Sequence, residues 1–129
     1  MANREYFFVD RAGKELDGGR YDKAEDFSEG LAAVFKDQQW FFIDETGTEI
    51  PGGYNSVGNF HQGFAWVEKD RRVFFIDKTG KKVFDDDYSR AGDFMRTGLA
   101  WVIKDSQYFF IDKTGKKIPG GGYEEQNSF

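Results

Sequence analysis

Four aspartates recur along the chain and are the residues whose spacing is most suggestive of chemistry. They lie 34, 33 and 35 residues apart, at Asp10, Asp44, Asp77 and Asp112. Proteins use clustered carboxylates for calcium binding, which takes six or more oxygens from a shaped loop, and for acid–base catalysis. Each aspartate here precedes a glycine by three residues, and in such a segment the carboxylate accepts backbone N–H groups of a tight turn. We therefore predict that all four cap turns.

The other residues that carry chemistry are sparse. The chain has one histidine, His61, and no cysteine, so a zinc site or a nucleophile–base pair cannot be assembled. The acidic run at residues 85–87 belongs to one repeat only and is at most a weak cation site. Paired glycines such as Gly52-Gly53 lack the following Lys-Ser/Thr of a phosphate-binding loop. We expect no enzymatic activity, no metal and no cofactor.

Composition excludes several classes of partner. The 129 residues include 3 Trp, 6 Tyr and 15 Phe, a load of aromatic side chains that must be buried or engaged. A net charge of -5 with interspersed signs lacks the basic stripe of a nucleic-acid-binding protein. No apolar run approaches the roughly 20 residues that span a bilayer, and the N-terminus does not resemble a secretory signal. We expect a cytoplasmic protein that binds neither nucleic acid nor membrane.

The elements that position the aspartate turns are repeated with them. The stretch from Trp40 to Gly47 reads Trp-Phe-Phe-Ile-Asp-Glu-Thr-Gly, and further copies begin at Tyr6, Val73 and Tyr108. A fixed period of this size indicates a tandem-repeat architecture. We divide the single repeat domain 1–129 into units at approximately 4–29, which is partial, 30–62, 63–97 and 98–129.

Each unit is predicted to form three short strands and one helical turn. The first strand covers 31–36, and the second is the opening motif, rich in the aromatic and β-branched residues that favour sheets. The segment between them has the length of a tight antiparallel hairpin. A third strand is expected at 49–50, ended by the Pro-Gly-Gly of residues 51–53. Apolar residues then step by three, which suits one turn of 3₁₀ or α-helix, at Tyr54, Val57 and Phe60.

Two segments carry a resemblance to a known family. Residues 27–34 read Phe-Ser-Glu-Gly-Leu-Ala-Ala-Val, and residues 75–83 read Phe-Ile-Asp-Lys-Thr-Gly-Lys-Lys-Val. With the other copies they resemble the bacterial WG-containing repeat, also called the KWG repeat, over residues 6–129. The resemblance implies an all-β repeat array that serves as an interaction module.

The chain departs from the pattern of that family at two positions of the unit. The glycine after the first aromatic residue of the motif, which names the family, is a phenylalanine in every copy, at Phe7, Phe41, Phe74 and Phe109. The change adds a ring where the family leaves space. The glycine expected in the hairpin turn is also replaced, by Gln38, Arg71 and Ser106.

Alternation along the hairpin separates two faces. A two-residue turn places Val34 opposite Phe41 and Ala32 opposite Ile43 on one face, which we interpret as the core. The other face varies between units except for one phenylalanine, and it carries the candidate binding residues. These are Trp40, Trp66, Trp101, Tyr108, Phe35 and Ile103. They form either an exposed aromatic strip that docks a partner or a face packed against neighbouring repeats or a second subunit.

We predict an all-β fold: a tandem array of about four units of 33–35 residues, each a short three-stranded antiparallel meander plus one helical turn, in an open solenoid-like stack. A small closed propeller-like ring is the alternative. Open arrays leave strand edges that dimerisation commonly covers, so a homo-oligomer is a further expectation.

For function, we predict a noncatalytic binding module for another protein, an adaptor or an inhibitor whose acidity suits a basic surface. One alternative is a carbohydrate-binding module that stacks sugars on Trp66 and Trp101. The other is a purely structural or self-assembling repeat domain.

Overall fold

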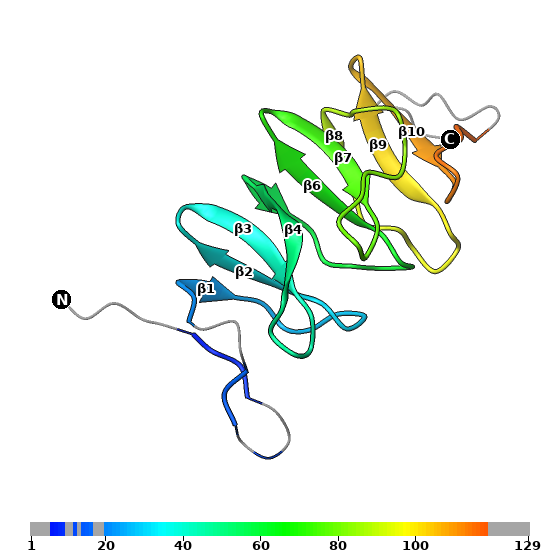
Figure 1. Cartoon of the computed structure of the whole chain (residues 1–129). Helices are drawn as coiled ribbons and strands as arrows, with labels where there is room; N and C mark the ends of the chain where they lie inside the picture. Colours follow the sequence, from blue (N-terminus) through cyan, green and yellow to red (C-terminus); the bar gives the residue numbers. More distant parts are fainter. Residues whose placement is uncertain (1–5, 10–11, 13, 17–19, 119–129) are drawn as a thin grey trace.

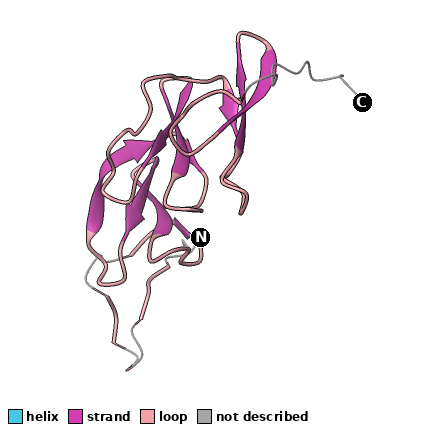
Figure 2. Ribbon diagram, turned by 90° about the vertical axis from the view of Figure 1, so that its right-hand side faces the viewer, coloured by secondary structure: helices cyan, strands magenta, loops and turns pink. Residues whose placement is uncertain are grey.

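The computed structural model describes residues 6–9, 12, 14–16 and 20–118. Within these residues, ten β-strands form three small antiparallel sheets that follow one another along the chain (Figure 1). Strands and loops account for all of the described residues, as the turned view in Figure 2 shows. Among these residues no helix is long and apolar enough to cross a membrane. The predicted all-β fold is confirmed.

The three sheets share one design, a hairpin of two five-residue strands with a two-residue strand at the sheet edge. The first sheet has the order β1 (Lys23–Ala24), β2 (Ala32–Lys36), β3 (Gln39–Ile43) and β4 (Glu49–Tyr54). The second has the order β5 (Ser56–Val57), β6 (Ala65–Lys69) and β7 (Arg72–Ile76). The third contains β8 (Arg90–Ala91), β9 (Ala100–Lys104) and β10 (Gln107–Ile111) in the same arrangement.

The hairpins have the predicted register. Val34 pairs with Phe41, and Ala32 pairs with Ile43. Both turn residues of each hairpin have positive φ, as in the type I′ turns whose twist matches that of paired strands. They are Asp37, Gln38, Asp70, Arg71, Asp105 and Ser106. Residues with side chains therefore take up the left-handed backbone that glycine adopts most readily.

The predicted helical turn was wrong. The segment from Tyr54 to Phe60 contains the edge strand β5, and Val57 pairs with Val67 of β6. The equivalent strands β1 and β8 pair with β2 and β9 in the same way. Apolar residues at every third position also fit a two-residue strand between bends. The strand prevails because it satisfies the backbone groups along the outer side of the hairpin, which a single helical turn would leave unpaired.

The third strand is longer than predicted in the first unit. β4 continues through Pro51, Gly52 and Gly53, so these residues do not end it. A register shift between Trp40 and Phe42 lets the strand follow β3 past this point. In the second and third units the third strand is reduced to single bridges, Ile76 with Lys82 and Ile111 with Lys117.

The stack is open, and the alternative of a closed ring was wrong. The first and third sheets lie at opposite ends of the molecule, with the second between them (Figure 1). The partial unit at the start contributes the bridges Tyr6 with Tyr21 and Val9 with Glu15. The expected fourth unit extends into residues 119–129, which lie outside the described part of the chain together with Asp10.

A tyrosine leads the chain from each sheet to the next. Tyr54 ends β4 beside Trp40 and is followed directly by β5 of the second sheet. Tyr88 exchanges two backbone hydrogen bonds with Val73, at 2.9 and 2.7 Å, just before β8. The recurrence of this tyrosine in the sequence therefore reflects a repeated crossing between sheets.

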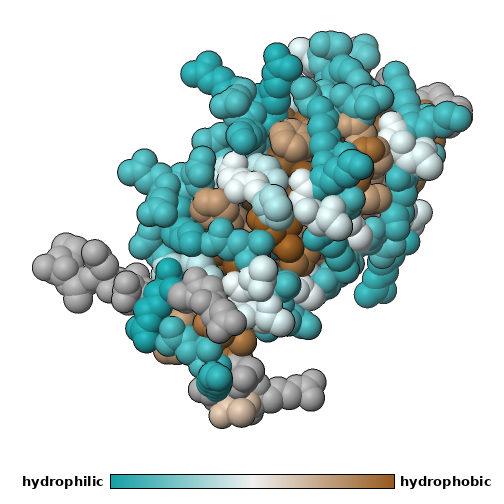
Figure 3. All heavy atoms as spheres, viewed as in Figure 1, coloured by the Kyte–Doolittle hydropathy of each residue, from teal (hydrophilic) through white to brown (hydrophobic). Residues whose placement is uncertain are grey.

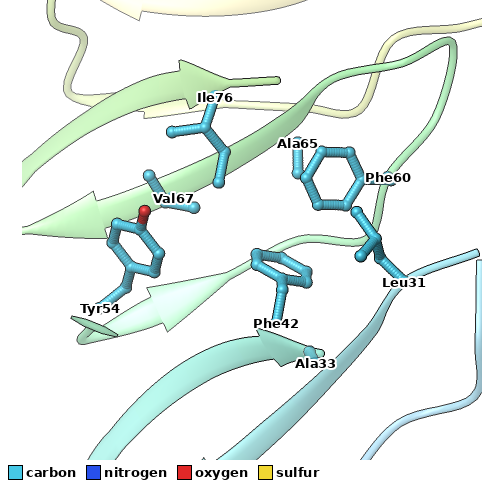
Figure 4. Packing of buried hydrophobic residues seen from close by; sticks show 8 residues of the cluster. All are labelled: Leu31, Ala33, Phe42, Tyr54, Phe60, Ala65, Val67 and Ile76. Carbon is cyan, nitrogen blue, oxygen red and sulfur yellow. The ribbon is translucent and has the colours of Figure 1, made fainter. Parts of the chain in front are cut away.

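Hydrophobic side chains fill the space between consecutive sheets. Figure 4 shows the cluster between the first two sheets, where the Phe42 and Phe60 rings meet edge to face at 4.8 Å between centroids. Phe75, Phe94 and Val102 belong to the equivalent cluster between the second and third sheets. Full burial of one such side chain contributes roughly 1.5–3 kcal/mol. Packing against neighbouring repeats thus accounts for the constant phenylalanine of the second face.

The outer face of the first sheet has its own cover. Ala32, Val34 and Ile43 pack with Tyr21, and partly buried Phe8 and Phe27 lie against them. These strand residues are the predicted core face, and their burial confirms that interpretation.

Candidate functional site

The repeated aspartates act in turns. Oδ1 of Asp77 accepts the backbone N–H of Thr79 at 2.9 Å and of Lys81 at 3.1 Å, and the Thr79 hydroxyl at 2.6 Å. Asp44 and Asp112 make the same set of bonds. The hydrogen bond from the threonine hydroxyl, and then those from the backbone, lower the pKa of each of the three carboxyls. The predicted capping role is confirmed for these three.

Two of the three acidic residues at 85–87 pair with lysines. Asp86 binds Nζ of Lys104 at 2.9 Å, and Asp87 binds Nζ of Lys82 at 2.7 Å. Within the described residues, no group of three or more His, Cys, Asp or Glu side chains could hold a metal ion. The surface carries charge here but no assembled centre.

Two hollows lie between consecutive sheets, one at each junction. The first hollow has a volume of about 210 Å³ and is lined by Glu25, Ala33, Trp40, Ser56, Val57, Gly58 and Asn59. The second has a volume of about 280 Å³ and is lined by Trp66, Glu68, Val73, Ser89, Arg90, Ala91 and Trp101. Figure 3 shows brown hydrophobic side chains visible between hydrophilic ones over the centre of the face in view.

The two hollows are repeats of one another. Ser56 and Val57 of β5 stand in the first where Arg90 and Ala91 of β8 stand in the second. Both hollows therefore open beside the edge strand of the following sheet.

Each hollow receives one indole from the preceding sheet, but different strands supply it. In the first hollow Trp40 comes from β3, and the β2 position holds Ala33. In the second hollow Trp66 comes from β6, and the β7 position holds Val73. The aromatic ring is thus retained at each junction while its anchoring strand changes.

Two glycines make room for the tryptophans on the first hairpin strand. A Cβ added at Gly58 would lie 2.3 Å from Nε1 of Trp66, and one at Gly92 would lie 2.1 Å from Nε1 of Trp101. The indoles therefore rest directly on the glycine backbone. In the first sheet the same pair of positions holds Glu25 beside Ala33, so a larger edge residue occurs where the indole is absent.

The six predicted binding residues fall into separate groups. Trp40 lines the first hollow, and Trp66 and Trp101 line the second, all three partly exposed. Phe35 packs on Trp40 at 5.3 Å between ring centroids. Tyr108 packs on Trp101 at 6.1 Å between ring centroids. Ile103 of β9 pairs with Tyr108 of β10. They all lie on one side of their sheets; Trp66 and Trp101 share the second hollow, and Trp40 lines the first.

The charged residues of the hollows were missed by the sequence analysis. Glu25 lines the first hollow, and Glu68 and Arg90 line the second; none of the three forms an ion pair with another described residue. One signal for these residues was present in the sequence: the edge position is glycine where the facing strand position is tryptophan, and glutamate where the facing position is alanine. A helical turn, which the apolar spacing predicts for these segments, does not place the two positions side by side, whereas an edge strand does.

The edge segments next to the hollows contain more acidic than basic side chains. The edge segments 22–26, 55–59 and 89–93, taken with Glu68, hold five acidic side chains against two basic ones. The acidic residues are Asp22, Glu25, Asp26, Glu68 and Asp93.

These features define a class, an all-β tandem-repeat protein with a repeated hollow at each junction between sheets. The model of the WG containing repeat matches residues 6–40, 40–71 and 74–108, and the chain belongs to this family. No curated protein and no solved structure matches the chain significantly.

Proposed function

We propose that this chain is a noncatalytic binding module for another protein, an adaptor or an inhibitor. The observation that carries the proposal is the repeated hollow, which places a partly exposed tryptophan beside polar residues of a strand edge at both junctions. Tryptophan in a partly enclosed recess is enriched among the residues that dominate binding energy. The retention of an indole at both junctions, from different strands, is expected if the ring itself is used.

The repeated carboxylates support a noncatalytic role. Asp44, Asp77 and Asp112 are engaged by backbone and hydroxyl donors of their own turns, so they are not directed at a substrate.

The test is affinity capture from the native cells, followed by binding of the purified partner. The wild-type chain, a Trp66→Ala and Trp101→Ala double variant and a Met95→Ala control are compared, after circular dichroism has shown that each is folded. Met95 is an exposed apolar side chain outside the hollows, 43% accessible. We expect the double variant to bind the purified partner at least tenfold more weakly, which corresponds to about 1.4 kcal/mol, and the control to bind normally. Equal affinity of all three proteins would contradict the proposal.

A carbohydrate-binding module is the second candidate. The second hollow combines two indoles with Glu68, Ser89 and Arg90, and such polar groups suit the hydroxyls of a sugar ring stacked on an aromatic face. A glycan array on the wild-type protein tests it. Binding that is lost in Trp66→Ala would favour this candidate, and no signal above background would remove it.

A further inference from the structure

We propose that the two hollows together take one extended, proline-rich peptide that carries lysine or arginine. The peptide lies across the edge strands β5 and β8, with a proline against Trp40 and another against Trp66. The inference rests on the proposed function and names the kind of protein segment that the module binds.

The placement of the hollows determines the direction of the ligand. They belong to different junctions, so a ligand that fills both must run along the stack and across the strands. A β-strand added to one sheet would run along the edge instead. It would find only the two residues of β5 or of β8 to pair with, which gives few hydrogen bonds. An extended ligand without inter-strand pairing is therefore favoured.

The stacking distance suits the polyproline II conformation. The hydrophobic clusters show that consecutive sheets pack face to face, and such sheets lie about 10 Å apart. A polyproline II helix has three residues per turn and rises about 3.1 Å per residue, so one turn advances about 9 Å. Every third residue of the peptide then meets the equivalent point of the next sheet. Proline-rich segments dock in aromatic-lined grooves in this conformation with little loss of conformational entropy.

The charges of the hollows favour a cationic peptide. Glu25 beside Trp40 and Glu68 beside Trp66 form no ion pair with any described residue. Arg90 also lines the second hollow, so the two hollows together carry one more acidic than basic side chain. Lysine or arginine between the prolines would lie within reach of these carboxylates. Because the glutamates are partly or fully exposed, their effect should weaken as salt is added.

The experiment uses three synthetic peptides and calorimetry with the full chain. The first has four Pro-Pro-Arg triplets, the second four Pro-Pro-Glu triplets, and the third four Ala-Ala-Arg triplets. We expect saturable binding of the first, at least tenfold weaker binding of the other two, and a change in tryptophan fluorescence on binding.

Variants locate the site. Trp40→Ala and Trp66→Ala should each weaken binding of the first peptide at least tenfold. Glu25→Gln and Glu68→Gln replace partly or fully exposed residues and preserve their shape, and they should weaken binding of this peptide severalfold. Glu45→Gln, at an exposed position outside the hollows, should leave binding unchanged. Equal binding of the arginine and glutamate peptides, or insensitivity to the hollow variants, would overturn the inference.

The two levels of proposal fail separately. If a captured protein binds through the tryptophans while the proline-rich peptides do not bind at millimolar concentration, only the inference about the ligand is wrong. If neither the partner nor the peptides respond to the tryptophan variants, the proposed function is wrong as well.

Discussion

The contact between Gly58 and Trp66 fixes the position of an indole that lines the second hollow. In Gly58→Ala the new methyl group would lie 2.3, 2.7 and 2.8 Å from Nε1, Cδ1 and Cε2 of the Trp66 ring. These distances are too short for non-bonded atoms, and a rigid indole can relieve them only by moving out of its position. The substitution should therefore displace the ring that lines the second hollow.

The expected magnitude follows from two opposing effects. Overpacking of this kind costs typically 1–3 kcal/mol. Gly58 is not among the glycines with positive φ, so alanine fits the backbone and should return about 0.4–1 kcal/mol by restricting the unfolded chain. We expect a net loss of about 1–2 kcal/mol in the free energy of unfolding. In the double variant with Trp66→Ala the clash is absent, as it is for Glu25 beside Ala33 in the first sheet.

The assay is a double-mutant cycle measured by urea unfolding with far-UV circular dichroism. The two substitutions should couple by about 1–2 kcal/mol, with the double variant more stable than the sum of the single losses predicts. Gly30→Ala is the matched control, because Gly30 has a φ of 85° but nothing within 4 Å of its added Cβ. It should lower stability through backbone strain and show no coupling to Trp66→Ala. Additive losses for Gly58→Ala and Trp66→Ala would refute the placement of the indole on the glycine.

Four further predictions concern the turns and the junctions. Asp77→Asn should lower the free energy of unfolding by about 1 kcal/mol, because the carboxylate accepts three hydrogen bonds in a turn that solvent partly screens. The pKa values of the turn aspartates are lowered in the folded chain. Their contribution to the free energy of unfolding is therefore complete above the unfolded pKa near 4 and is lost as pH falls through the folded pKa values. A melting temperature that is unchanged between pH 7 and pH 3 would contradict this. Glu29→Gln should cost about 1 kcal/mol and speed amide exchange at Gln62 and Gly63, whose N–H groups bind the carboxylate at 2.7 and 2.8 Å; unchanged exchange would argue against this clamp between units. Tyr88→Phe should leave stability unchanged or raise it by about 1 kcal/mol, because the buried hydroxyl has no hydrogen-bond partner among the described residues. A large loss in a thermal melt would show that the hydroxyl is engaged.

Burial also affects the ionisation of Tyr88. Its removal from solvent, reinforced by the negative charges of Asp86 and Asp87, raises the pKa of the phenol to about 12. The side chain therefore stays neutral over the ordinary pH range. Loss of the hydroxyl in Tyr88→Phe thus changes no charge, and the stability comparison is clean.

The local part of the fold was predictable from the sequence. Val34 and Phe41 face each other because a two-residue turn and the two-residue side-chain period leave one register that buries both apolar sets. The aspartate turns were predictable for the same reason, since donor and acceptor lie within four residues. The edge strands were not, because β5 is defined by pairing with a hairpin that begins several residues later, while its apolar spacing of three is equally helical.

The candidate site was only partly predictable. The residue types of Trp40, Trp66 and Trp101 pointed to a binding surface, and the structure places all three in hollows. Their division among sheets depends on how the sheets stack, which strand patterns do not encode. Glu25 and Arg90 were overlooked because their segments were given the wrong secondary structure.

If the hollows themselves bind the partner, as we propose, a bulky label placed in one of them should block binding. The chain has no cysteine, so single cysteines can be placed and labelled cleanly. Ser89→Cys puts a bulky maleimide in the second hollow, while Thr97→Cys puts the same label on an exposed turn outside both hollows. We expect the label at position 89 to weaken binding of the purified partner at least tenfold and the label at 97 to have no effect. Equal affinities of the two labelled proteins would contradict it.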